Sequence, residues 1–352
     1  MTHDAMTDVD FAGQLLRWHS IHGRHNLPWQ VNPTPYRVWI SEIMLQQTQV
    51  STVIPFFLRF MKRFPDVHSL AAADRDQVLH LWTGLGYYAR ARNLHQAART
   101  ICDEFKGQFP ASVEQLTTLS GVGKSTAGAI AALSLGVRAP ILDGNVKRVL
   151  TRFQAIAGYP EKSDIKQQLW EIADSFTPRQ NFAEYTQAIM DLGATVCTRS
   201  KPQCGECPVH QYCKAFLTDT IGSYPGRKSK KSLPVRTVTM FVLRNQHAEV
   251  LLERRPPSGI WGSLYCLPEF DGDVAPEVKS IQAIALPSDG RVQLTEIRHS
   301  FSHFHLHIKP VLINVVHDKT GIADSNHWLW YPLDHSVEVG LAAPVKKLLV
   351  SL

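Results

Sequence analysis

The stretch LSGVGKSTAGAI, residues 119–130, decides how the first two-thirds of this chain should fold. Its GKST letters belong to the nucleotide-binding pattern G-x4-G-K-[ST], but that pattern also needs glycine at position 118, where the chain has Thr118. The preceding segment, ASVEQLTTL, shows the period of a helix and not of a buried strand. We therefore predict two helices joined by a Gly-Val-Gly turn. The bare N–H groups of such a turn favour a phosphate group, with a plain helix–helix turn as the alternative.

On both sides of this hairpin the helical pattern continues, from residue 1 to about residue 220. A basic stretch with two prolines, SYPGRKSKKSLPVR, then has the composition of a linker. Beyond it, short alternating segments such as RTVTMFVL, AEVLLER and HWLWYP indicate strands. The sequence thus predicts an all-α part followed by an α+β domain with a mixed sheet.

The composition is that of a globular protein of two or three domains. The chain has 352 residues, of which 44% are hydrophobic and 19% charged, and its formal net charge is +6. This charge favours a polyanionic partner only weakly, because many soluble proteins are mildly basic. We see no signal peptide and no apolar run of about 18 residues that could span a membrane. We therefore expect a soluble, monomeric protein of the cytoplasm, associated with the nucleoid if it is bacterial.

Four cysteines form the pattern C-x6-C-x2-C-x5-C, which points to a metal centre and not to a disulfide framework. Four thiolates this close along the chain can surround a tetrahedral zinc ion or an iron–sulfur cluster. Spacing alone leaves both possibilities open, because the usual zinc pattern has two C-x2-C pairs and this chain has one. The cysteines are Cys197, Cys204, Cys207 and Cys213.

Two carboxylic acids stand where their surroundings should push their pKa values apart. Glu42, in WISEIMLQQTQV, falls in the apolar stripe of a helix, where burial raises the pKa of a carboxyl group. Asp143, in ILDGNVKRVL, precedes a helix whose N-terminus should lower its pKa. A plain N-cap is the simpler role for Asp143. Together, however, the two residues suit an acid and an anion at one site.

These motifs together resemble the MutY-type adenine DNA glycosylases, members of the helix-hairpin-helix superfamily that includes endonuclease III. The resemblance is carried by WISEIMLQQTQV, LWTGLGYYARARNL, LSGVGKSTAGAI, ILDGNVKRVL and the cysteine pattern, and it covers nearly the whole chain. RRPPSGIWGSLYCLPEF and FSHFHLHI resemble the Nudix-like second domain of that family. The chain departs from the family at Ser120, where proline is usual.

The resemblance implies a multidomain fold: an all-α helix-hairpin-helix glycosylase core with one [4Fe–4S] cluster on the four cysteines, and an α+β Nudix-like domain. The helical catalytic domain would span residues 1–222. Within it, a helical-barrel lobe with the hairpin would cover about 27–137, and a cluster lobe would join 1–26 to 138–222. A linker at 223–234 would lead to the lesion-recognition domain at 235–352.

The same resemblance implies a role for each matching residue. Glu42 would protonate adenine at N7, and Asp143 would stabilise the sugar cation or trap it covalently. Asn145 would lie near the reacting sugar. Trp29 and Gln187 would line the pocket of the flipped adenine.

Further residues would contact DNA. The DNA-binding residues implied by the resemblance are Gln47, Thr48, Leu85, Tyr87, Gly121, Gly123 and Ser125. Gln47 would fill the space left by the flipped base, and Tyr87 would stack beside the opposite guanine. The turn Phe301–Ser302–His303 would probe the base opposite adenine. Read from its pattern as one strand, however, 298–308 would place His303, His305 and His307 on one face.

Ser125 occupies the position where bifunctional members of the superfamily carry the lysine that forms a Schiff base. The resemblance therefore implies a monofunctional glycosylase of base excision repair, which flips out and removes adenine opposite 8-oxoguanine or guanine in double-stranded DNA. A bifunctional endonuclease III-like glycosylase/lyase is the nearest alternative. A nucleotide pyrophosphatase is disfavoured, because the second domain offers only scattered acids, Glu269 and Glu277. A non-catalytic, metal-stabilised DNA-binding scaffold is the remaining alternative.

Overall fold

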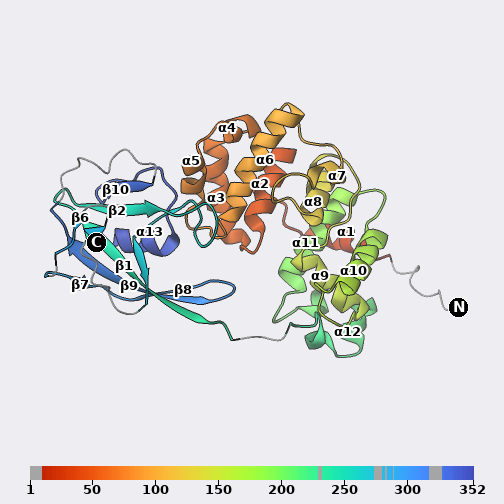
Figure 1. The fold of residues 1–352 in the computed structure, drawn as a ribbon. Helices are drawn as coiled ribbons and strands as arrows, with labels where there is room; N and C mark the ends of the chain where they lie inside the picture. The colour runs from red at the N-terminus through yellow and green to blue at the C-terminus, as the bar shows by residue number, and fades with distance from the viewer. Residues whose placement is uncertain (1–9, 229–231, 273–279, 282–283, 288, 317–326) are drawn as a thin grey trace. The chain divides into compact units, whose positions relative to one another are not determined.

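The computed structural model describes residues 10–228, 232–272, 280–281, 284–287, 289–316 and 327–352 (Figure 1). Contacts divide the chain into two compact units. The first joins Met1–Ala72 to Gln96–Ser229, and the second joins Ala73–His95 to Lys230–Leu352. Residues 229–231 of the predicted linker, and Glu277, lie outside the described residues.

The inclusion of Ala73–His95 in the second unit differs from the predicted domain boundaries. Polar contacts explain this grouping. Asp76 forms an ion pair with Arg254, and the Tyr88 hydroxyl donates to the carbonyl of Leu341 at 3.1 Å. These partners are more than 170 residues apart along the chain, so no local pattern could reveal them.

The first unit is helical, as the sequence predicted. Its helices are α1 (Phe11–His22), α2 (Pro35–Leu45), α3 (Val50–Arg63), α4 (Val67–Ala71), most of α6 (Ala89–Phe105), α7 (Val113–Leu116), α8 (Lys124–Ser134), α9 (Gly144–Gln154), α10 (Ser163–Phe176), α11 (Phe182–Asp191) and α12 (Lys214–Leu217). Short turns at η1 (Leu192–Val196), η2 (Cys204–Glu206), η3 (His210–Tyr212) and η4 (Ile221–Ser223) complete it. Among the described residues, no helix is long and apolar enough to cross a membrane.

The hairpin at 119–130 forms as predicted, but its first arm is short. Helix α7 is a single turn. The hydroxyl groups of Thr117 and Thr118 donate hydrogen bonds to backbone carbonyls of the preceding turn, at 2.7 and 2.8 Å, and these bonds compete with continuation of the helix. Gly121 then takes a φ of +78°, a conformation that glycine adopts without strain. Gly123 caps α8. A Cβ at Gly123 would meet no atom within 4 Å, so this backbone is open to a ligand.

One apolar core joins the N-terminal helix to α9, α10 and α11. Phe11 lies between Phe153 and Phe176, with ring centroids 4.8 and 4.7 Å away. After α11 the chain continues as the π-helical turn η1, where Gly193 approaches Asn145 so closely that a Cβ would sit 2.6 Å from its side chain. This packing fixes the start of α9 relative to α11.

The second unit contains a mixed sheet, as predicted. Its strands are β1 (Val235–Arg244), β2 (Glu249–Arg254), β3 (Tyr265–Cys266), β4 (Glu269–Asp271), β7 (Val292–Gln293), β8 (Ile297–Ser300), β9 (His305–Asn314) and β10 (Trp328–Pro332). The order is β10-β2-β1-β9-β7, with β1 and β9 parallel and the other pairs antiparallel. A separate pair, β5 (Ser280–Ile281) and β6 (Ile284–Ala285), and the helices α5 (Arg75–Trp82) and α13 (Ala343–Val350) complete the described part.

The reading of 298–308 as one strand was wrong. The segment is a hairpin: Ser300 of β8 pairs with His305 of β9, and Phe301 donates its N–H to the carbonyl of Phe304 at 2.9 Å. His303 therefore lies in the exposed turn. The alternation of polar and apolar residues in 303–308 begins inside the turn, so it does not show where the second strand starts.

Candidate active site

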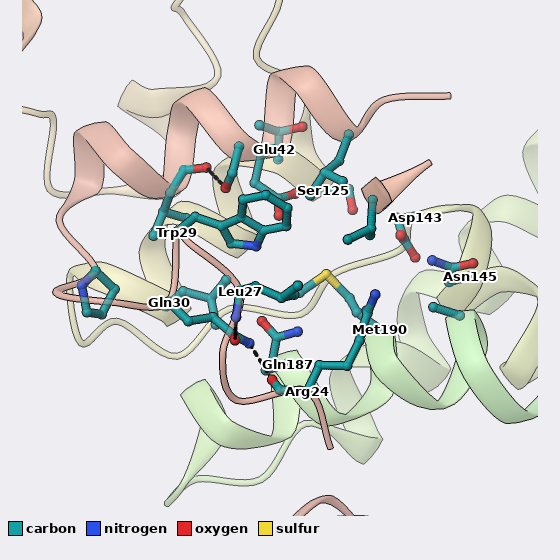
Figure 2. Close-up of a pocket in the computed structure, with 18 of the residues that line it drawn as sticks. Arg24, Leu27, Trp29, Gln30, Glu42, Ser125, Asp143, Asn145, Gln187 and Met190 are labelled. Atoms are coloured by element: carbon teal, nitrogen blue, oxygen red, sulfur yellow. Dashed lines mark hydrogen bonds between the residues drawn. The ribbon is translucent and has the colours of Figure 1, made fainter. Parts of the chain in front are cut away.

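A cavity of about 690 Å³ lies in the first unit, and all the predicted catalytic and base-pocket residues line it (Figure 2). Side chains reach it from α2, the loop at 24–33, α8, the start of α9 and α11. The predicted residues in its wall are Trp29, Glu42, Gln47, Thr48, Ser125, Asp143, Asn145 and Gln187. Residues more than 140 positions apart along the chain thus share one cavity.

Glu42 reaches the cavity from the middle of α2. Thr34 caps this helix and Pro35 begins it, while the buried side chains of Trp39, Ile43 and Met44 hold it in the core. Burial, together with the negative charge of Asp143, raises the pKa of Glu42 to about 8. Glu42 is therefore mainly protonated at neutral pH, as its place in an apolar stripe predicted.

Asp143 caps α9, and its Oδ1 accepts a hydrogen bond from the N–H of Val146 at 2.7 Å. The prediction that its pKa is lowered was wrong: burial raises the pKa of Asp143, against the opposing effects of the cap hydrogen bonds and of nearby Arg148 and Lys147. The predicted order of ionisation still holds, because the charge of Asp143 is one cause of the raised pKa of Glu42. The pair can thus hold one proton donor and one anion.

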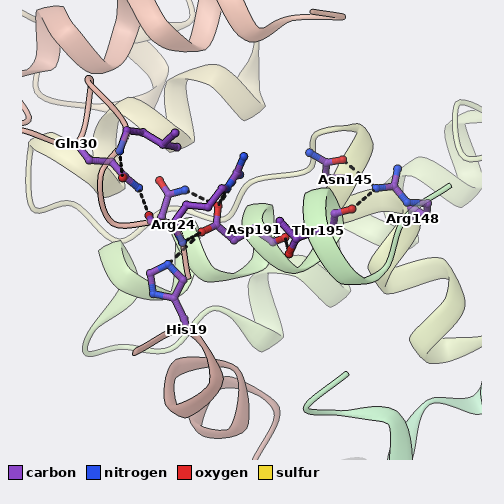
Figure 3. A network of polar contacts seen from close by, with 10 residues as sticks. His19, Arg24, Gln30, Asn145, Arg148, Asp191 and Thr195 are labelled. Carbon is purple, nitrogen blue, oxygen red and sulfur yellow. Dashed lines mark hydrogen bonds and ion pairs between the residues drawn. The ribbon is translucent and has the colours of Figure 1, made fainter. Parts of the chain in front are cut away.

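Arg148 contacts the side chain of Asn145 (Figure 3) and also the backbone of the first cysteine. The Nη2 of Arg148 donates to Asn145 Oδ1 at 2.9 Å, and its Nε donates to the carbonyl of Cys197 at 2.7 Å. Sequence reasoning missed Arg148. It faces Asn145 because the two residues are three positions apart on one helix.

The base-pocket residues are held in different ways. Trp29 is 6% exposed and packs edge-on against Phe57, with ring centroids 5.5 Å apart. Gln187 donates from Nε2 to Asp191 Oδ1 at 2.8 Å. Asp191 is fully buried and also binds Arg24, yet sequence reasoning missed it. Its only sequence signal is an acid in the apolar stretch of α11, four residues after Gln187.

The hairpin presents Ser125 to the cavity, and its neighbour Lys124 elsewhere. Ser125 Oγ accepts the N–H of Leu142 at 3.0 Å. The Nζ of Lys124 lies 4.2 Å from the ring centroid of Trp170. No amine of the hairpin therefore occupies the position of Ser125, although one stands directly beside it in the sequence.

The proposed DNA contacts outside the hairpin differ in exposure. Gln47, two residues after the end of α2, is exposed and has a φ of +56°, while Thr48 is partly buried. Tyr87, in the second unit, is 51% exposed with a φ of +49°. Arg90 lies 5.5 Å from the Tyr87 ring centroid and donates to the carbonyl of Leu85 at 3.3 Å. Leu85 itself is only 6% exposed, which does not suit an inserting side chain in this conformation.

The turn at 301–303 also belongs to the second unit. Phe301 stacks on Phe304 with centroids 4.6 Å apart and lies 5.4 Å from the ring of Trp261. Ser302 and His303 are exposed, and their Oγ and Nδ1 atoms are 3.4 Å apart. The turn thus has an anchored aromatic base and a polar tip.

The four predicted cysteines line one small pocket under α9. Arg152 of α9 donates from Nη1 to the Sγ of Cys197 at 3.4 Å. Burial raises the pKa of the Cys207 thiol to about 12, so a bound metal centre would be needed to stabilise the thiolate. In the described part of the chain, no three His, Cys, Asp or Glu side chains are close enough to share a single metal ion. The four thiols nevertheless line one pocket, as their spacing along the chain predicted.

Comparisons with known families agree with this architecture. Residues 40–175 match the family described as HhH-GPD superfamily base excision DNA repair protein. Residues 197–213 match the iron-sulfur binding domain of endonuclease III, and residues 239–351 match the NUDIX domain. The fold and the site together define a helix-hairpin-helix DNA-repair glycosylase with an iron–sulfur motif and a Nudix-like second domain.

Similar proteins narrow the class. The chain is 40% identical to an adenine DNA glycosylase of Buchnera aphidicola subsp. Schizaphis graminum, over 98% of this chain and 99% of the relative. It is 33% identical to human adenine DNA glycosylase, over 84% of this chain and 65% of the relative. The chain belongs to the adenine DNA glycosylase family, whose members hydrolyse an N-glycosidic bond in DNA during base excision repair.

Solved structures share the fold of the helical part. A thermostable thymine-DNA glycosylase superposes with a TM-score of 0.54 at 25% identity, covering 59% of this chain and 95% of its own. Endonuclease III in a non-covalent complex with DNA gives a TM-score of 0.51 at 20% identity, covering 59% and 94%. At these identities the likeness concerns the fold.

Proposed function

We propose that this adenine DNA glycosylase removes adenine paired with 8-oxoguanine or guanine, and leaves the DNA strand uncut. The observation that carries the proposal is the pairing of Glu42 and Asp143 in one cavity that has Ser125, and no lysine, at the hairpin position. A glycosylase needs a proton for the departing base and a negative charge for the sugar. A lyase would need an amine in addition.

In the proposed reaction, protonated Glu42 donates its proton to N7 of the flipped adenine as the bond between N9 and the sugar breaks. The sugar gains the character of an oxocarbenium ion, which ionised Asp143 stabilises until water attacks. Asn145, held by Arg148, would contact the reacting sugar. Trp29 would form the wall of the pocket beside the adenine ring, and Gln187 would hydrogen-bond to the polar edge of the base.

Gln47 and Tyr87 would enter the duplex. Both side chains are exposed and both residues have positive φ, a conformation that costs free energy in residues other than glycine and recurs at functional sites. Insertion would offset the unstacking cost of flipping out the adenine. We assign the second insertion to Tyr87 and not to Leu85, which is buried. The open backbone of Gly123, together with the exposed Gly121, would bind a phosphate.

The second unit would recognise the base opposite adenine through the turn at 301–303. 8-Oxoguanine carries an N7–H donor where guanine has an acceptor, and the Ser302 hydroxyl can accept a hydrogen bond from that donor. Phe301 would hold the turn in place through its contacts with Trp261 and Phe304. The recognition domain would follow a linker near residues 223–234.

The cysteines Cys197, Cys204, Cys207 and Cys213 would hold one [4Fe–4S] cluster. When bound, the cluster would cross-link the segment 197–213 to itself, and Arg152 of α9 would contact it through the Sγ of Cys197. Purified protein should be brown and contain about four irons per chain. One zinc and no iron in anaerobically prepared protein would exclude the cluster.

Base release from four duplexes tests the proposed specificity. Adenine would be placed opposite 8-oxoguanine, guanine, cytosine and thymine, under single-turnover conditions. We expect fast release opposite 8-oxoguanine, slower release opposite guanine and little release from the other two duplexes. Borohydride added during the reaction should trap almost no protein on the DNA. Equal rates on all four duplexes would contradict the specificity, and efficient trapping would contradict the monofunctional mechanism.

A further inference from the structure

We infer that Asp191 is a positioning residue that fixes the direction of the Gln187 amide, and that it thereby makes the cavity select adenine over purines with an oxygen at C6. The inference rests on the proposed role of Gln187 as the reader of the flipped base. Asp191 itself lines no part of the cavity and would not touch the substrate.

The contact depends on helical spacing. Gln187 and Asp191 are four residues apart on α11, so their side chains share one face of the helix. The Gln187 Nε2 donates to Asp191 Oδ1 at 2.8 Å. Asp191 is 0% exposed, so water does not compete for this oxygen.

Asp191 can only accept hydrogen bonds, because its partners hold it as a carboxylate (Figure 3). Arg24 donates from Nε and Nη2 to Oδ1 at 2.9 and 2.6 Å, and its backbone N–H donates to Oδ2 at 2.7 Å. His19 Nε2 lies 3.4 Å from Oδ2. These hydrogen bonds lower the pKa of Asp191 despite its burial. A carboxylate in this state must face the NH2 group of Gln187 and not its oxygen.

Because Nε2 faces Asp191, the amide presents its acceptor, Gln187 Oε1, to a ligand in the cavity (Figure 2). An oxygen acceptor there suits the 6-amino group of adenine, which donates. Hypoxanthine and guanine carry a carbonyl oxygen at C6, which would face another oxygen and be repelled. A freely rotating glutamine would not discriminate, because its amide could turn to donate instead. The selectivity thus depends on Asp191, which orients the amide, as well as on Gln187, which contacts the base.

Asp191→Ala and Asp191→Asn distinguish the effect of the hydrogen bond to Gln187 from the effect of the negative charge. Both variants remove the negative charge, but only asparagine keeps an oxygen for Gln187. The asparagine oxygen should occupy the Oδ1 position, because three donor groups converge there and only two nitrogens approach Oδ2. We expect Asp191→Asn to retain selectivity and Asp191→Ala to lose it.

The experiment measures single-turnover release of adenine and of hypoxanthine, each opposite 8-oxoguanine. The readout is the rate of adenine release divided by the rate of hypoxanthine release for each variant. A smaller fraction of folded enzyme lowers both rates equally and does not change this ratio. In Asp191→Ala this ratio should fall at least about tenfold below that of the wild type, the size expected for one oriented hydrogen bond. Asp191→Leu fills a similar volume but offers no hydrogen-bond acceptor, so it should lower the ratio as Asp191→Ala does. It replaces Asp191→Ala in the experiment if the alanine variant does not fold.

Two controls define the result. Gln187→Leu should lower the ratio by itself, and adding Asp191→Ala to it should lower the ratio no further, because the effect passes through Gln187. Asp174→Ala removes an aspartate that pairs with Arg138 on the surface of the same unit, and should leave the ratio unchanged.

Four outcomes are distinguishable. If the wild type released no adenine from these duplexes, the proposed function itself would fail. If it released both bases equally, Gln187 would not read the C6 substituent. If Asp191→Ala slowed both bases by the same factor, Asp191 would be merely structural. If alanine and asparagine changed the ratio alike, the charge and not the amide direction would be the cause, and the inference would be overturned.

Discussion

Replacing Glu42 by glutamine should abolish base release and at the same time stabilise the folded protein. Glutamine has nearly the shape of a protonated glutamic acid, so the wall of the cavity should be unchanged. It cannot donate the proton that a departing adenine needs. The two expected effects have the same cause, which is the raised pKa of Glu42.

The kinetic effect follows from the protonation state. With a pKa of about 8, roughly nine-tenths of Glu42 is protonated near pH 7 and ready to donate. General acid catalysis contributes about 10²–10⁴-fold to a rate, and adenine is a poor leaving group, so we expect a loss near the upper end of that range. Binding of DNA with adenine opposite 8-oxoguanine should change little. Single-turnover release and an equilibrium binding titration measure the two quantities separately.

The stability effect has a defined dependence on pH. The unfolded chain releases the Glu42 proton near its ordinary pKa of 4.5, whereas the folded chain keeps it until about 8. Between these values the wild type loses stability as the pH rises, and the glutamine variant does not. The variant should therefore match the wild type below about pH 4.5, and exceed it by about 3 kcal/mol near pH 7. Above about pH 8 the difference should become constant.

Thermal unfolding of both proteins from about pH 5 to pH 9 measures this difference. Glu171→Gln is a matched control in the same unit, at an exposed residue of α10 whose side chain accepts a hydrogen bond from Gln167. A glutamine variant that still released adenine rapidly would remove Glu42 from the mechanism. An inactive variant with no gain in stability near pH 7 would show that Glu42 is not held protonated in the folded state, and the acid would have to be sought elsewhere.

Three further changes test other parts of the proposal. Asp143→Asn should also lose base release at least about 10²-fold, because a neutral amide cannot balance a sugar cation; near-normal single-turnover release would leave Asp143 only its role as the cap of α9. Ser125→Lys should raise the yield of borohydride-trapped complex above that of the wild type, since it brings an amine to the cavity; unchanged trapping would mean that this position does not face the sugar. Ser302→Ala combined with His303→Ala should narrow the gap between adenine opposite 8-oxoguanine and adenine opposite guanine, by about tenfold in relative rate, and leave the slower reaction nearly unchanged; equal slowing of both substrates would make the turn a general DNA contact.

Local patterns were enough to predict the helical part, the hairpin, the cysteine site and the strands other than the segment 298–308. Each depends on neighbours within a few residues: the period of apolar residues, the glycines of a turn, or the spacing of thiols. The environment of Glu42 was predictable for the same reason, because an acid among Trp39, Ile43 and Met44 on one helix must share their burial.

What the sequence could not predict depends on contacts between distant segments. The pKa of Asp143 is raised because the cavity around it is built from elements far along the chain, and this burial outweighs the local cap. Asp191 carries no motif, and its partners Arg24 and His19 lie more than 160 residues away. The grouping of Ala73–His95 with the second unit likewise depends on partners that no periodicity reveals.

Identification of the products from one duplex, with adenine opposite 8-oxoguanine, tests the proposed activity most directly. After a single turnover by the wild-type enzyme, mass spectrometry of the mixture should find free adenine, an abasic strand of full length and an intact strand that still contains 8-oxoguanine. Alkali should then cleave the abasic strand, which the enzyme has left uncut. Free 8-oxoguanine among the products, or a strand already cleaved before alkali, would contradict the assignment of this site as a monofunctional adenine glycosylase.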